Sequence, residues 1–157
     1  KKGCKLKYLG KNEEALKGLE KGIEMDPKKI GAWNIKGIEL GRLGKLEEAL
    51  KCYNKAIELD PKFIPAWNNK GDALRKLDKK EEALECFDKA IELAPDNILS
   101  WFKKGFAYFR MAKPTMGDED RKNYEQDLEC FEKATNLINT MEVGVGVISY
   151  VVEHKPY

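Results

Sequence analysis

A repeat with a fixed period constrains the fold of this chain more than any other feature of its sequence. Residues 30–61 read IGAWNIKGIELGRLGKLEEALKCYNKAIELDP, and residues 64–95 read IPAWNNKGDALRKLDKKEEALECFDKAIELAP. When the second copy is laid on the first, Trp33 aligns with Trp67, Gly37 with Gly71, Ala49 with Ala83, Tyr53 with Phe87, Ala56 with Ala90 and Pro61 with Pro95. A fixed period of about 20 to 50 residues is typical of stacked-repeat proteins, in which neighbouring units bury a continuous core.

Each repeat predicts two helices, because apolar residues recur at helical spacing in two runs. In residues 30–61 the first run begins at Trp33 and the second at Leu46. Gly44 between them predicts a turn, and Pro61 follows the second helix. Two helices joined by so short a loop lie antiparallel. Each hairpin alone leaves an apolar face in water, so the next hairpin is expected to stack on it.

The first copy of the repeat, residues 1–27, is incomplete. It lacks the start of its first helix, and Gly10 predicts the turn between its helices as Gly44 does in the next copy. The sequence has no initiator Met and begins partway through a repeat. We therefore expect it to be part of a longer protein.

The last copy, residues 98–139, departs further from the pattern. Its second-helix motif LECFEKA, at residues 128–134, comes ten residues later than the period requires. This delay predicts an insertion near residues 113–122, followed by a longer second helix for which Asp118 is the candidate cap. Asp127 stands where the two regular copies have Ala, which disfavours close packing of this helix pair.

Residues 140–157 differ from the rest of the chain, since they are rich in β-branched residues and glycine. Val145, Ile148 and Val152 fall near the apolar places of another first helix. This register favours a capping segment that covers the last repeat. The alternative is a β-prone tail that pairs with another segment or chain.

The shared residues resemble the tetratricopeptide repeat, a helix–turn–helix unit of about 34 residues. The signature positions of that repeat are occupied here by Trp33, Gly37, Ala49, Tyr53, Ala56 and Pro61, and by their equivalents in residues 64–95. The resemblance implies an all-α, right-handed superhelical solenoid of about four stacked antiparallel helix hairpins over residues 1–139. It also implies a non-enzymatic scaffold for protein–protein interaction, which binds a peptide or helix of a partner in a concave groove.

The candidate binding residues are those of the first helices that the packing signature does not use. They are Asn34, Ile38, Asn68, Asn69, Asp72, Phe102, Lys103, Phe106 and Phe109. Asn side chains can donate to and accept from a peptide backbone. The three Phe form an apolar patch if no other segment covers them, and an exposed patch of this kind indicates a binding site. Some family members clamp a partner's terminal carboxylate with Lys, Asn and Arg, but only Asn69 matches clearly, so no clamp is expected.

Composition and motifs exclude several classes of function. Lys and Arg number 29 against 27 Asp and Glu, a balance that does not favour nucleic acid. No apolar run reaches the roughly 18 residues of a membrane span. The cysteines show no metal-ligand spacing, and we expect them to be buried, reduced thiols of a cytoplasmic protein. His154 has no nucleophile partner, so we expect no enzyme activity, no cofactor and no metal.

Two other functions remain open at this level. The chain could be a structural solenoid that self-associates through its ends as a homo-oligomer, or the targeting module of a larger enzyme.

Overall fold

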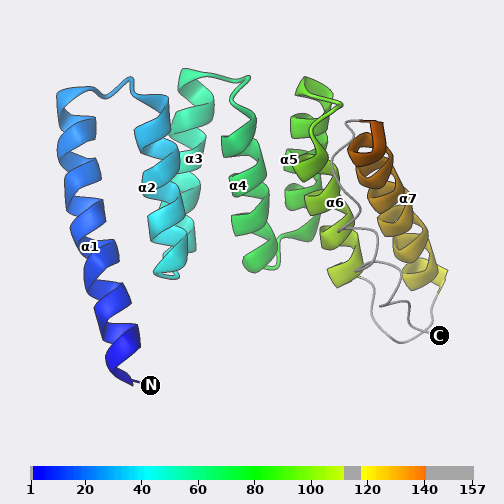
Figure 1. The fold of residues 1–157 in the computed structure, drawn as a ribbon, viewed down its shortest axis with the longest axis horizontal. Helices are drawn as coiled ribbons and strands as arrows, with labels where there is room; N and C mark the ends of the chain where they lie inside the picture. The colour runs from blue at the N-terminus through cyan, green and yellow to red at the C-terminus, as the bar shows by residue number, and fades with distance from the viewer. Residues whose placement is uncertain (1, 112–117, 141–157) are drawn as a thin grey trace. The chain divides into compact units, whose positions relative to one another are not determined.

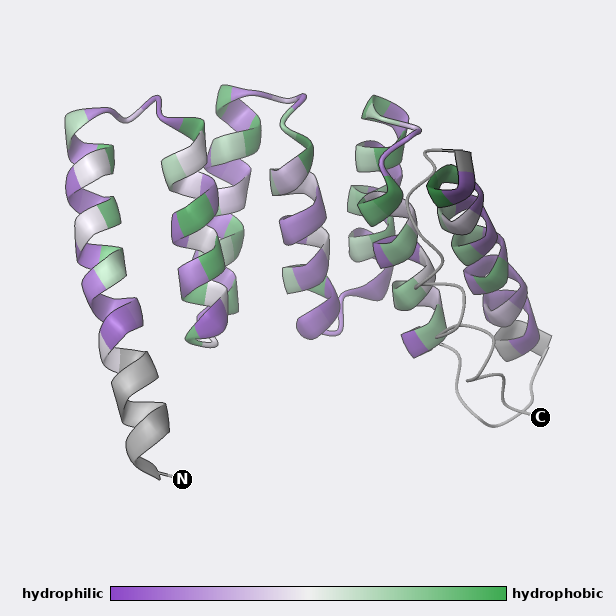
Figure 2. Ribbon diagram, in the orientation of Figure 1, coloured by the Kyte–Doolittle hydropathy of each residue, from purple (hydrophilic) through white to green (hydrophobic). Residues whose placement is uncertain are grey.

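The computed structural model describes residues 2–111 and 118–140, which form seven helices and no strand (Figure 1). The helices are α1 (Lys2–Met25), α2 (Ile30–Arg42), α3 (Leu46–Leu59), α4 (Ile64–Lys76), α5 (Lys80–Leu93), α6 (Ile98–Met111) and α7 (Asp118–Thr140). In Figure 2, green apolar and purple polar residues alternate around the helices, as the spacing in the sequence predicts. The predicted all-α class and the stacking of antiparallel helix hairpins are confirmed.

Contacts divide the chain into two compact units, Lys1–Leu93 and Ala94–Tyr157. Helices α1 to α5 belong to the first unit, and α6 and α7 belong to the second. Within the first unit, α2 pairs with α3 and α4 pairs with α5, while α3 packs on α4 and α1 packs on α2 (Figure 1).

The two hairpins of the first unit turn through the same backbone conformation. Gly44 has a φ of +78°, and Asp78, which occupies the equivalent place one repeat later, has a φ of 63°. The turns close with matching hydrogen bonds, from Lys45 N to the Leu40 carbonyl at 2.9 Å and from Lys79 N to the Leu74 carbonyl at 3.0 Å. Left-handed backbone costs glycine little and is tolerated by Asp, so two different residues make one turn.

Small and aromatic residues make the close contact between paired helices. Ala49, Ala56, Ala83 and Ala90 have no exposed surface. A Cβ atom at Gly37 would collide with the ring of Tyr53, and one at Gly71 would lie 2.5 Å from the ring of Phe87. The repeated glycine therefore lets the second-helix aromatic ring lie directly against the first helix.

The turn predicted at Gly10 is wrong, because α1 runs through this residue without a break. Gly44 leaves the helical conformation where the two packed helices of a hairpin meet. Gly10 instead lies inside α1, with helical residues on both sides. Glycine at such a site costs a helix about 1 kcal/mol but does not by itself end it.

The second unit is a hairpin in which α6 packs on α7. A Cβ atom at Gly105 would lie 3.0 Å from the ring of Phe131, so the close contact of glycine with an aromatic ring is kept. The packing proceeds although Asp127 replaces Ala: Asp127 is itself buried, as is Ala134 two helical turns further on. Most of the predicted insertion, residues 112–117, lies outside the described residues. The predicted capping segment or tail, from residue 141 onward, lies outside them as well.

Candidate functional site

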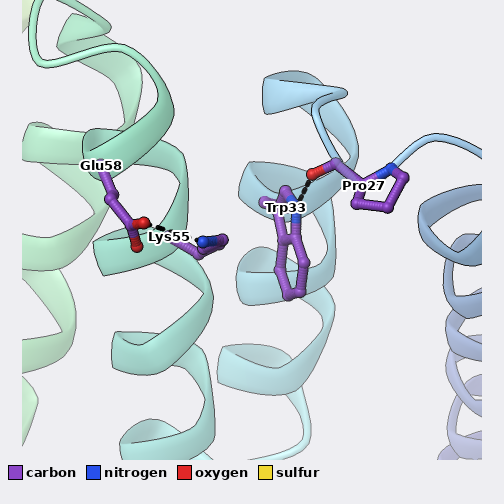
Figure 3. A network of polar contacts seen from close by, with 4 residues as sticks. All are labelled: Pro27, Trp33, Lys55 and Glu58. Carbon is purple, nitrogen blue, oxygen red and sulfur yellow. Dashed lines mark hydrogen bonds and ion pairs between the residues drawn. The ribbon is translucent and has the colours of Figure 1, made fainter.

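Each of the three tryptophans forms a hydrogen bond to the loop that precedes its own helix, α2, α4 or α6. Each indole Nε1 donates a hydrogen bond of 2.9 Å to the carbonyl oxygen of a proline six residues earlier: Trp33 to Pro27, Trp67 to Pro61 and Trp101 to Pro95. Figure 3 shows the first of these bonds. All three Trp are half-buried, and their recurrence in one structural role explains them without a ligand.

Ion pairs lie on the exposed surface of α3 and α5, the second helices of the two hairpins. The same view shows Lys55 and Glu58, whose Nζ and Oε1 atoms lie 2.9 Å apart (Figure 3). The equivalent pair one repeat later, Lys89 with Glu92, has the same distance of 2.9 Å. Exposed pairs of this kind contribute little to stability, and their recurrence makes them a feature of the repeat surface.

Two of the predicted polar contact residues join neighbouring repeats. The Nδ2 atom of Asn69 on α4 donates a hydrogen bond of 3.0 Å to Oδ1 of Asn34 on α2. Asn34 is 8% exposed and Asn68 is 2% exposed, so both side chains lie inside the first unit. These amides therefore serve the packing of α4 on α2.

The remaining candidates in the first unit are partly accessible. Ile38 is half-buried and packs against the core around Leu40 and Ala49. Asp72 is half-buried, with its Oδ1 3.9 Å from Nε of Arg75 one helical turn away. Whether these side chains contact a partner stays a prediction.

The three predicted phenylalanines lie exposed on α6 and continue in a longer apolar row. Phe102, Phe106 and Phe109 are 40%, 37% and 44% exposed, and Leu99, at the start of the row, is 54% exposed. The rings of Phe106 and Phe109 stack at 6.5 Å between centroids. Helical spacing of about three to four residues places all four side chains along one side of α6.

Helix α7 extends this apolar surface. The ring of Phe131 lies 5.6 Å from that of Phe102. Tyr124 and Leu128, which precede Phe131 at helical spacing, are also exposed. We call the surface formed by these side chains the α6–α7 face; its members are Leu99, Phe102, Phe106, Phe109, Tyr124 and Leu128. The sequence interpretation did not include Leu99, Tyr124 and Leu128 among the candidate residues, although the spacing of 124, 128 and 131 is that of an amphipathic helix.

Cations follow one edge of the row on α6. The sequence of this helix, ILSWFKKGFAYFRM, contains three cationic residues and no acidic one. Lys103 precedes Phe106 by three residues and Arg110 follows it by four, so both lie on the helix surface next to Phe106. Lys103 is half-buried, and Arg110 is exposed.

Two cysteines, a tyrosine and an aspartate are buried titratable groups, and burial raises the pKa of each. Burial raises the pKa of the Cys52 thiol and raises that of Cys86 to about 11. Burial also raises the pKa of Tyr53 to about 12 and that of Asp127 to about 6. A thiol whose pKa lies this high is a poor nucleophile near neutrality. Cys52, Cys86 and Cys130 are buried thiols that are not part of a disulfide, as predicted.

Two further features concern the residues that the structure describes, 2–111 and 118–140. There, no group of three or more His, Cys, Asp or Glu side chains is arranged to hold a metal ion. Among the same residues, no helix has both the length and the apolar content that crossing a membrane requires.

Stacked antiparallel hairpins with a recurring glycine–aromatic contact define a helical-repeat protein. The sequence model of the tetratricopeptide repeat matches residues 31–63 and 64–97. Residues 31–97 thus contain two tetratricopeptide repeats, and the helical hairpins have the architecture of a scaffold for protein interaction.

Solved structures share this fold at low sequence identity. A crystal structure of MamA is 20% identical, with 83% of this chain and 71% of that chain covered and a TM-score of 0.70. A MamA structure from Desulfovibrio magneticus RS-1 is 22% identical, with 88% and 72% covered and a TM-score of 0.69. These likenesses show the fold alone. No curated protein matches the sequence.

Proposed function

We propose that this chain is a non-enzymatic, cytoplasmic scaffold that binds a peptide or helix of a protein partner, with Phe102, Phe106 and Phe109 as the apolar anchor. The observation that carries the proposal is the exposure of these rings. At one register position of the repeat, the first helices bury Asn34 and Asn68 but expose Phe102 to 40%. Large apolar side chains that lie exposed next to one another on a protein surface are typical of binding sites.

Polar groups would contribute orientation to this binding. Lys103 adjoins the Phe row, and in the first unit Asn69 and Asp72 are partly accessible on α4. The apolar Ile38 is partly accessible on α2 and would add a hydrophobic contact. Asn34 and Asn68 would act indirectly, by holding α2 and α4 in place. The buried thiols support a reducing compartment, because free cysteines persist where disulfides do not form.

The test is the double variant Phe102→Ala/Phe106→Ala. Partners captured by the wild-type chain from the source cell are identified, and the affinity of the purified partner is then measured for both proteins. We expect a loss of about 10-fold or more, since truncating anchor residues typically costs over 1 kcal/mol each. Ile35→Ala is the matched control, because Ile35 is also an exposed apolar residue, 47% exposed, but lies on α2. Unchanged affinity in a folded double variant contradicts the proposed anchor.

Self-association through the chain's ends is the competing function. Sedimentation over a concentration range separates the two. A monomer at all concentrations that still captures a partner supports the scaffold, whereas assembly that depends on concentration and that Phe106→Ala leaves intact favours the structural role.

A further inference from the structure

The α6–α7 face is bordered by cations on one helix and by carboxylates on the other. On α6, Lys103 and Arg110 follow the edge of the apolar row, and that helix has no acidic residue. On α7, Glu125 precedes the exposed Leu128 by three residues and Glu132 follows it by four, so both carboxylates lie beside it on the helix surface. Both glutamates are exposed.

The two charged edges lie on the outer sides of the helix pair. Between the helices, a Cβ atom at Gly105 of α6 would lie 3.1 Å from Cβ of Cys130 on α7. The two cations stand two or five residues from Gly105, and the two carboxylates stand two or five residues from Cys130. At 3.6 residues per turn, such separations place side chains on nearly opposite sides of a helix. The cationic edge is therefore on the side of α6 away from α7, and the acidic edge is on the side of α7 away from α6.

The cations and the carboxylates also lie at matching levels along the helices. Helices α6 and α7 are the two arms of one antiparallel hairpin, side by side in Figure 1. Counting along both helices from the contact between Gly105 and Cys130, Lys103 is level with Glu132. By the same count, Arg110 is level with Glu125. Within one copy, the width of the helix pair separates each cation from the carboxylate at its level.

This charge pattern is complementary to itself. A two-fold rotation about an axis parallel to the helices brings the α6–α7 faces of two copies together, exchanges the two edges and leaves each residue at its level. Helix α6 of each copy then lies on α7 of the other, and Arg110 meets Glu125 of the second copy. A two-fold axis across the helices would instead place α6 on α6 and set the cationic edges against each other, which like-charge repulsion disfavours.

We infer that the α6–α7 face binds the same face of a second copy of this chain, with α6 of each copy on α7 of the other. The inference rests on the proposed function and names the partner that the phenylalanine anchor binds. Burial of the exposed apolar side chains supplies the affinity, and the charged edges fix the orientation.

Arg110 and Glu125 are the residues on which the orientation depends most. Lys103 already interacts within its own copy, so its charge is partly engaged. Glu125 has Arg121 at 3.7 Å, but both side chains of that pair are mostly exposed, and such a pair contributes little. Glu125 therefore stays able to bind a cation of the second copy.

Charge-reversal variants of the full chain test the inference by sedimentation over a range of concentrations at low salt. We expect the wild type to form a dimer that dissociates on dilution. Arg110→Glu opposes two carboxylates at both contacts related by the two-fold axis, and Glu125→Arg opposes two guanidinium groups, so each should weaken the dimer about 10-fold or more. An equimolar mixture of the two variants should restore a dimer to within about threefold of the wild type, because every contact in the mixed pair joins opposite charges.

Matched controls use residues that are not part of this face. Glu92→Arg reverses an exposed carboxylate on α5, and its mixture with Arg110→Glu should restore nothing. Phe106→Ala should weaken the dimer, whereas Ile35→Ala, at an exposed apolar residue of α2, should leave it unchanged. High salt should reduce the effect of the charge variants but not that of Phe106→Ala, since salt screens only the charges.

Other results overturn the inference. A wild-type chain that is monomeric at every concentration contradicts the dimer, and the proposed anchor still stands if Phe102→Ala/Phe106→Ala loses a captured protein. A dimer that Phe106→Ala leaves intact forms through another surface. A dimer that depends on Phe106 but is unaffected by both charge variants has another orientation.

Two further outcomes separate the inference from its neighbours. If Ile148→Asp/Val152→Asp converts a monomer into a dimer, the chain's own C-terminal segment covers the face in the wild type, and the inference is wrong. If the mixture of charge variants restores the dimer while Phe102→Ala/Phe106→Ala still captures a different protein with unchanged affinity, the dimer is supported and the proposed anchor for that protein fails.

Discussion

Gly71 lies directly against the ring of Phe87, so that a Cβ atom at position 71 would be 2.5 Å from Cε1 of the ring. Phe87 has no exposed surface and cannot move aside without opening the core between α4 and α5. The same contact recurs between Gly37 and Tyr53 and between Gly105 and Phe131. This contact between glycine and an aromatic ring lets the two helices of each hairpin approach closely.

Gly71→Ala is therefore expected to destabilise the chain by about 1–2 kcal/mol, because overpacking at the ring exceeds the gain in helix propensity. Gly18→Ala in α1 is the control, since nothing lies within 4 Å of a Cβ atom there. It should stabilise the chain by about 0.5–1 kcal/mol. Urea unfolding followed by circular dichroism measures both changes, and equal effects of the two substitutions would refute this account of the glycine.

Asp78→Gly is expected to stabilise the hairpin of α4 and α5 by about 0.5 kcal/mol, because Asp78 has a φ of 63°, a conformation that costs a residue with a Cβ atom more than it costs glycine. The ion pair that it makes with Lys80 at 3.3 Å contributes little, because the Asp78 side chain is 85% exposed. Gly44→Asp, the reverse change in the equivalent turn, should lower stability by a similar amount in the same assay. A loss of stability in Asp78→Gly would mean that the turn depends on the aspartate.

Asp127 should make stability depend on pH. Burial raises its pKa from 3.8 to about 6, so the folded state binds this proton more tightly than the unfolded state does. Its contribution is therefore most favourable below about pH 4 and is lost as the pH rises through about 6. Asp127→Asn cannot ionise, and we expect it to be more stable than wild type by about 1 kcal/mol at pH 8 and nearly equal to it at pH 4.

Thermal unfolding of the wild type and of Asp127→Asn from pH 4 to pH 8 measures this difference. Asp88→Asn on α5 is the control, because Asp88 is exposed, and it should show a constant offset. A gap between wild type and Asp127→Asn that does not change with pH would contradict the assignment.

The bond between Asn69 and Asn34 should couple the two residues energetically. Asn69→Ala leaves a buried amide oxygen of Asn34 without this donor, which typically costs about 1–3 kcal/mol. The double variant Asn34→Ala/Asn69→Ala should be less destabilised than the sum of the single variants, with a coupling of about 1 kcal/mol. Unfolding free energies of the four proteins measure the cycle, and strict additivity would show that the amides act independently.

The sequence by itself determined the helices and their pairing. Trp33, Gly37, Ala49 and Tyr53 recur in the next copy as Trp67, Gly71, Ala83 and Phe87. The glycines contact the aromatic ring of the same hairpin, and the tryptophans bond to a proline six residues earlier. Such contacts are local, so a single repeat contains the information that specifies them. The same alignment of the repeats predicted that the cysteines are buried and that a long helix, α7, follows the insertion.

Only the tertiary structure decided which of the remaining side chains face water. Gly10 carries the same turn signal as Gly44 but lies inside the continuous helix α1, whereas Gly44 adopts a positive φ. Asn34 appeared in the sequence as a surface contact and is buried because α4 lies over it, while Phe102 at the same register is exposed. Burial depends on what packs against a face from outside the repeat, and the repeat pattern does not encode that.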